Sequence, residues 1–149
     1  MRIATLAGIS ALLFTSLCFL CAAQNKPEKT GPPSDYSELE KAPAKYRAKA
    51  NPLAKDNDSI PAGKILFEEH CAECHGENAL GTKKAPNLRA KEVQTAPPGT
   101  LFWILSNGIV RKGMPVWSKL PEPQRWQLIT FVQSLGPLEA AENKTAAKP

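Results

Sequence analysis

The stretch Cys71-Ala72-Glu73-Cys74-His75 determines what the rest of the chain can fold around. Its two thiols lie about one helical turn apart, so both can add across the two vinyl groups at one edge of a porphyrin. The residue after the second thiol is then held beneath the iron, where a histidine supplies an axial nitrogen. The spacing therefore predicts one haem attached through Cys71 and Cys74, with His75 as an iron ligand.

A thiol redox pair and half of a zinc site are the two competing interpretations of this motif. A structural zinc site needs four ligands, but outside the predicted signal peptide, which holds Cys18 and Cys21, the sequence contains no second Cys-x-x-Cys motif. His70 directly precedes Cys71, so it could join a site with the motif only at poor geometry. The sequence thus favours haem attachment over both alternatives.

The N-terminal residues 1–23 have the pattern of a secretory signal peptide. Arg2 supplies the charge, and a largely apolar stretch follows as far as Leu20. The small residues Ala22 and Ala23 then predict cleavage after Ala23. An uncleaved membrane anchor is the alternative, because the apolar stretch is nearly long enough to span a bilayer. Both interpretations place the rest of the chain in the periplasm, either free or tethered.

Cysteine usage and net charge narrow the choice of function. Cys18 and Cys21 lie in the predicted signal peptide, so Cys71 and Cys74 are the two cysteines of the mature chain. A structural disulfide framework is therefore excluded. The formal net charge of +5 is modest and not clustered into a basic stripe, so the composition does not indicate nucleic-acid binding.

Composition divides the mature chain into three parts. Residues 24–59 are rich in Pro and Lys and have few apolar side chains, which predicts a linker or a docking strap because little surface can be buried there. A plain flexible linker is expected for 24–41, whereas 46–53 is a candidate for packing on the domain surface. Residues 60–137 form the predicted haem domain, and the polar tail 138–149 is expected to be disordered.

Helical signals recur through the predicted haem domain. A helix over 61–71 begins with Pro61, which suits a first turn, and carries the motif at its C-terminal end. A short helix over 101–105 ends at Asn107-Gly108. A last helix over 121–135 has apolar residues at the spacing of a buried face. No alternating strand pattern competes with these helices, so the predicted fold class is all-α.

Met114 is the candidate for the second axial ligand. It is the one methionine besides the initiator, and it lies in a loop over 109–119 between Gly113 and Pro115. A lone methionine more often fills a gap in the core, but that role expects an apolar helical face. A glycine and a proline on either side instead give a stiff, closely approaching backbone that can present the thioether to iron.

These features resemble class I cytochromes c, the small monohaem cytochromes of the bacterial periplasm. The resemblance covers about Ile60 to Pro137. It consists of Gly63, Phe67, Cys71, Cys74, His75, Ala85-Pro86-Asn87-Leu88, Asn107-Gly108, Gly113-Met114-Pro115-Val116-Trp117 and Phe131. The fold that the resemblance implies has about four short helices wrapped around one covalently bound haem c.

The resemblance also implies a particular packing of the first and last helices. They are expected to cross near Gly63, which lets Phe67 pack on Phe131. One departure from the family is the pair Pro121 and Pro123 at the start of the last helix, where a Ser or Thr cap is more usual. Without a Ser or Thr cap, the start of the last helix loses a stabilising hydrogen bond, but the expected fold is unchanged.

Further residues of the haem pocket follow from the same resemblance. The carbonyl of Pro86 is expected to accept a hydrogen bond from the ring nitrogen of His75 that does not face the iron. Leu88 and Trp103 are expected to line the pocket.

The function implied is one-electron transfer with His/Met axial ligation in an exported respiratory or dehydrogenase chain, by a carrier that is not itself an enzyme. One alternative is the haem-bearing subunit of a larger dehydrogenase or terminal oxidase, with 24–59 as its docking element. Another is a gas-binding or peroxidatic protein in which Met114 leaves the iron. The sequence contains no flavin or nicotinamide fingerprint and no second haem motif.

Redox proteins are the expected partners. Five basic residues lie near the haem motif or Met114 in the sequence, namely Lys83, Lys84, Arg111, Lys112 and Lys119. If these residues ring one exposed haem edge, they would steer an acidic partner towards it. An ordinary solvated surface is the alternative.

Overall fold

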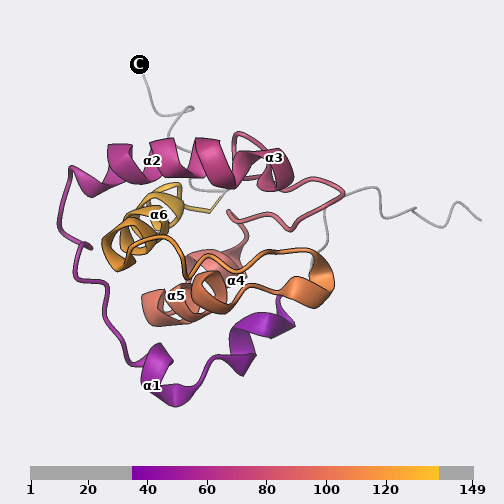
Figure 1. Ribbon diagram of the computed structural model, residues 1–149, viewed down its shortest axis with the longest axis horizontal. Coiled ribbons are helices and arrows are strands. Elements are labelled where there is room, and N and C mark those ends of the chain that lie inside the picture. Colours follow the sequence, from indigo (N-terminus) through magenta and orange to yellow (C-terminus); the bar gives the residue numbers. More distant parts are fainter. Residues whose placement is uncertain (1–34, 138–149) are drawn as a thin grey trace, which may run out of the picture.

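The computed structural model describes residues 35–137, which form helices joined by turns (Figure 1). Their elements in chain order are η1 (Ser37–Lys41), α1 (Ala44–Arg47), α2 (Ser59–His70), α3 (Ala72–His75), α4 (Lys91–Gln94), α5 (Pro98–Asn107), η2 (Val110–Lys112) and α6 (Glu122–Ser134). No strand occurs among these residues, and the predicted all-α class is confirmed. The predicted signal peptide, residues 24–34 of the predicted linker and the predicted tail lie outside the described residues.

Helices α2 and α6 cross at a glycine, and this crossing fixes where the haem motif lies. A Cβ atom on Gly63 would be 2.1 Å from the backbone oxygen of Gln127 and 2.8 Å from Cβ of Phe131, so only glycine fits. One turn further on, the rings of Phe67 and Phe131 pack with centroids 5.4 Å apart. The crossing and the aromatic pair implied by the resemblance are both present.

Replacing Gly63 with Ala is expected to lower the free energy of unfolding by about 3 kcal/mol, because the new methyl group overlaps backbone atoms of α6 that cannot rotate away. Helix propensity alone would favour Ala by about 1 kcal/mol, so the direction of the change tests the crossing. Thermal and denaturant melts of the holoprotein measure it. Ile65→Ala, at an exposed position of the same helix, is the matched control, and equal stability of the two variants would contradict the prediction.

Helix α5 is longer than the sequence predicts but ends where expected. It begins at Pro98, three residues before the predicted start, and stops at Asn107. Gly108 then adopts a φ of +66°, and a Cβ there would lie 2.6 Å from the carbonyl oxygen of Pro115. The glycine therefore lets the loop that carries Met114 fold back against the end of α5.

The core between α5 and α6 depends on two stacked aromatic rings. Trp126 is 1% exposed and stacks on Phe102 with ring centroids 4.3 Å apart. Helix α6 begins after Pro121 without a side-chain cap, in agreement with the departure noted in the sequence. The packing of Trp126 holds this uncapped end in place.

Residues 35–53, called the strap below, lie against the domain on the side of α5 that faces away from α2 (Figure 1). Ala42 is 2% exposed, and the amide of Asn51 donates to the hydroxyl of Thr130 at 2.9 Å with both residues buried. A Cβ on Gly99 would lie 1.8 Å from the carbonyl oxygen of Tyr46, so α1 rests directly on the α5 backbone.

A plain linker was expected over residues 24–41, but its described part, residues 35–41, is structured: η1 forms there and Glu38 is buried. The packing of 46–53, by contrast, agrees with the sequence-based expectation, since Tyr46 and Leu53 contact the core. The physical reason is that this segment is held by small residues and satisfied polar groups, which need few large apolar side chains.

Within residues 35–137, none of the helices has both the length and the apolar character needed to cross a bilayer.

Candidate functional site

The two thiols of the motif lie on one short turn between α2 and α3. Helix α2 ends at His70, and α3 begins at Ala72, with the amide of His75 bonded to the carbonyl of Cys71 at 2.9 Å. Both cysteines are free and half-buried. Burial raises the pKa of Cys71 to about 11, so this sulfur is a protonated thiol near neutral pH. A catalytic redox pair would instead have a lowered thiol pKa.

His75 has the geometry of an oriented metal ligand. The residue is 9% exposed, and its Nδ1 lies 2.9 Å from the carbonyl oxygen of Pro86. Since a carbonyl can only accept, Nδ1 carries the proton and Nε2 keeps its lone pair. Burial lowers the pKa of His75, although the bond to Pro86 acts in the opposite direction. The hydrogen bond implied by the resemblance is therefore present, on a neutral ring.

Hydrogen bonds hold the loop after the motif in the shape that brings the Pro86 carbonyl to His75. The amide of Gly81 donates to the carbonyl of His75 at 2.8 Å, and the hydroxyl of Thr82 donates to the carbonyl of Cys74 at 2.6 Å. The amide of Leu88 closes the loop by donating to Ala79 at 2.8 Å. Thr82 was not singled out from the sequence, because a hydroxyl eight residues past its acceptor leaves no local pattern.

Met114 lies in a tight loop that packs on the same core as the motif. The amide of Ile109 donates to the carbonyl of Met114 at 3.0 Å, which forms the isolated bridge of this region. Gly113 has a φ of +88° just before the methionine. The Met114 side chain is half-buried and, like Cys71 and Leu88, contacts the hydrophobic cluster around Phe67.

Half-buried apolar and aromatic side chains surround this region. Leu88 contacts the core cluster, Trp103 is half-buried on α5, and Trp117 packs on His70 with ring centroids 5.1 Å apart. Among the described residues no three His, Cys, Asp or Glu side chains lie close enough to hold a metal ion. The donor set is therefore two thiols, one imidazole and one thioether with apolar neighbours, which fits a covalently held haem rather than a zinc site.

The family of this chain follows from its sequence match. Residues 58–132 match the family model described as cytochrome C oxidase, cbb3-type, subunit III. The chain belongs to this family of c-type cytochrome domains. Membership implies covalently bound haem c and a role in electron transfer rather than catalysis in its own right.

Individual relatives of the cytochrome agree with this assignment. The Cbb3-type cytochrome c oxidase subunit CcoP of Azospirillum brasilense is 32% identical over 62% of the chain and 34% of its own length. The quinohemoprotein alcohol dehydrogenase ADH-IIG of Pseudomonas putida is 31% identical over 58% of the chain and 12% of its own length. The chain thus spans about a third of the oxidase subunit and much less of the dehydrogenase.

A solved structure supports the fold of the cytochrome as well. Cytochrome CL from Methylophaga aminisulfidivorans superposes with a TM-score of 0.51 at 25% identity, covering 67% of this chain and 72% of that one.

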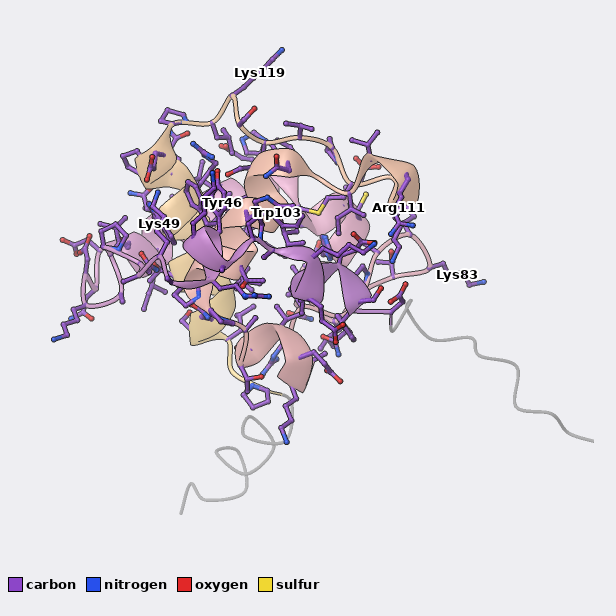
Figure 2. The ribbon with its side chains drawn as sticks, turned by 90° about the horizontal axis from the view of Figure 1, so that it is seen from below. Tyr46, Lys49, Lys83, Trp103, Arg111 and Lys119 are labelled. Carbon is purple, nitrogen blue, oxygen red and sulfur yellow. The ribbon has the colours of Figure 1, made fainter. Side chains whose placement is uncertain are left out.

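Three of the five basic residues that were considered for a ring at the haem edge are paired with carboxylates of the cytochrome itself. Lys84 lies 3.2 Å from a carboxylate oxygen of Glu73, while Arg111 and Lys112 are paired with acidic residues of the strap. Figure 2 places Lys83 and Lys119 at separate edges of the molecule. Most of the positive charge near Met114 is therefore neutralised within the chain.

A shallow hollow of about 520 Å³ lies elsewhere on the cytochrome, beside α1 and α5. Tyr46, Lys49 and Phe102 line it, and the ammonium of Lys49 lies 4.4 Å from the Phe102 ring centroid. None of the predicted haem residues borders this hollow, so it is not the cofactor site.

Proposed function

We propose that the cytochrome transfers single electrons through one haem c, attached by Cys71 and Cys74 and ligated by His75 and Met114. The observation that carries the proposal is the hydrogen bond from Nδ1 of His75 to Pro86, on the same turn as two free thiols. That bond leaves Nε2 as an oriented lone pair, which is the role a proximal ligand needs.

Each residue of the site has a separate task in this proposal. When bound, the haem supplies an iron that alternates between the ferric and ferrous states. The Met114 thioether favours the ferrous state and so raises the reduction potential relative to a second nitrogen ligand. The Pro86 carbonyl fixes the orientation of His75 and makes its ring more basic. Leu88 and Trp103 exclude water from the site.

The setting we propose is an exported respiratory or dehydrogenase chain in the periplasm. The N-terminal pattern over 1–23 supports export, with the leader either cleaved or kept as a tether. A second candidate is a haem-bearing subunit of a terminal oxidase, which the family match over residues 58–132 and the names of the relatives favour. The strap is less available as an intermolecular docking element, because its described part packs on its own domain.

Redox proteins are the proposed partners, and the residues near Met114 indicate the charge of the docking face. Lys84, Arg111 and Lys112 are engaged by acidic residues of the chain itself. Val110 and Val116, on either side of Met114, are 70% and 46% exposed. These positions favour a largely neutral contact near Met114 over one governed by an acidic partner.

The visible spectrum in alkaline pyridine tests the proposal directly. Denaturation in pyridine replaces both axial ligands, so the position of the α band reports how many vinyl groups have become thioethers. We expect the spectrum of a haem with two thioethers, and a redox titration of the native protein that fits one electron. Haem that is extracted by acidified acetone, or a spectrum with one thioether, would contradict attachment through both cysteines.

A further inference from the structure

The turn that precedes Met114 is not held by apolar packing. None of the three residues of η2 is buried, Val110 is 70% exposed, and the side chain of Arg111 is 62% exposed. A Cβ on Gly113 would meet nothing within 4 Å. Polar contacts must therefore hold this turn in place.

Backbone hydrogen bonds within the loop supply some of these contacts, and the side-chain contacts of the turn come from the strap. The guanidinium of Arg111 donates to Glu38, whose side chain is 11% exposed. The ammonium of Lys112 lies 2.5 Å from Asp35 and 3.5 Å from the same Glu38 oxygen. Within the described residues, every hydrogen bond from an η2 side chain goes to Asp35 or Glu38. The bond from Lys112 also holds the pKa of Asp35 below its usual value, so this carboxylate stays ionised.

The strap also touches the loop on the histidine side of the site. The hydroxyl of Tyr36 donates to the carbonyl of Asn87 at 2.9 Å, one residue after the Pro86 carbonyl that orients His75. Figure 2 shows Arg111 at the end of the strap away from Tyr46 and Lys49. Because α1 also packs on the α5 backbone at Gly99, the strap contacts the domain at several points between Asp35 and Asn51.

We propose that the strap is a positioning element for the axial methionine: Glu38, with Asp35, clamps η2 and thereby limits how often Met114 moves away from the iron. This inference rests on the proposed His/Met ligation. It assigns to residues 35–41 control over access of external ligands to the iron.

Because Glu38 is nearly buried, its ion pairs with η2 should contribute more than ion pairs at the surface. Ion pairs between exposed side chains contribute little because water and salt screen them. Here one carboxylate that is nearly buried receives Arg111, Lys112 and Lys41, the last at 2.9 Å. Removing its charge weakens the hydrogen bond from Arg111 and takes away one of the two carboxylates near Lys112, which keeps its bond to Asp35, so the turn should open more often.

The test uses the full-length holoprotein and cyanide as the external ligand. Cyanide binds ferric iron only after the methionine has left, so its binding rate reports how often the loop opens. In Glu38→Gln we expect this rate to rise by roughly tenfold, as for loss of one charge-assisted contact. The long-wavelength absorption band of methionine-ligated ferric haem should weaken at a lower temperature than in the wild type.

Glu40→Gln is the matched control. Glu40 lies on the same helix η1 and is exposed, and its carboxylate makes no hydrogen bond among the described residues. It should leave the rate within about twofold of the wild type, as expected for a surface charge. Arg111→Gln removes the other partner of the ion pair at an exposed position, so the core is not disturbed. Its cyanide-binding rate should match that of Glu38→Gln, and the double variant should bind cyanide little faster than either single variant.

Two outcomes would overturn the inference. If cyanide binds Glu38→Gln and Arg111→Gln at the wild-type rate while their melting temperatures fall, the strap is structural and the proposed function stands. If the wild type itself lacks the methionine band, the proposed ligation fails, and the clamp fails with it.

Discussion

Replacing both Cys71 and Cys74 with Ser is expected to yield a colourless protein that does not fold stably. The thioethers that these two residues are proposed to form would be lost, and with them the anchor of the haem. A domain of this size buries a small core of its own, so the cofactor has to supply part of the apolar contact. Half-buried side chains such as Leu88, Met114 and Trp117 would then face water.

Absorbance at the Soret band and far-ultraviolet circular dichroism, followed through a thermal melt, measure this outcome. The single variants Cys71→Ser and Cys74→Ser are the controls, because each keeps one thiol and should retain coloured protein with a one-thioether pyridine spectrum. A compact double variant with a cooperative melt and no haem would show that the core is sufficient without the cofactor.

The sequence could predict the haem turn because its chemistry is local. The spacing of Cys71, Cys74 and His75 depends on one turn of backbone, and the structure places them on one turn. The crossing at Gly63 and the packing of Phe67 on Phe131 were expected from the resemblance to class I cytochromes c, and both are present. The predicted helix over 61–71 differs in that α2 begins at Ser59, two residues earlier, and ends at His70, with the motif on a separate turn.

Only part of the strap was predicted, since packing was expected for residues 46–53 but not for 35–41. Two contacts anchor it: the side-chain amide of Asn51 donates to the hydroxyl of Thr130, and Gly99 of α5, which has no side chain, lets the carbonyl of Tyr46 lie against the α5 backbone. Neither contact adds large apolar side chains to the segment, so composition favoured a plain linker over 24–41 and left 46–53 as a candidate for packing. Gly99 in the first turn of α5 was the one available signal, because a glycine inside a helix often marks a close approach.

The sequence also could not predict which basic side chains form ion pairs. Arg111 and Lys112 were grouped with Lys83 as candidates for a basic ring at the haem edge, but they are paired with strap residues more than seventy positions away. A count of basic residues cannot include partners brought in by tertiary structure. Similarly, Trp126 was not assigned to the core from the sequence, although it is 1% exposed.

Replacing Met114 with Ala is expected to convert the proposed electron carrier into a protein that binds external ligands. Loss of the thioether should lower the reduction potential by about 0.1 V or more, since axial ligands set haem potentials over a range of roughly 0.8 V. Ferrous Met114→Ala should bind carbon monoxide, whereas the wild type should bind it weakly near neutral pH. Some peroxidase activity should accompany the open site. Val116→Ala, at a 46% exposed position of the same loop, is the control.

The result discriminates between carrier and catalyst because few side chains could replace Met114. His70 lies beside the motif with its ring packed on Trp117, and Lys112 is held by Asp35 and Glu38. If both stay where they are, the iron of Met114→Ala keeps an open face, and carbon monoxide affinity rises as the potential falls. Tight binding of carbon monoxide by the wild type would instead mean that the methionine is not a stable ligand. An unchanged potential and spectrum in Met114→Ala would mean the same. Either result would move the chain from electron transfer towards the gas-binding or peroxidatic alternative.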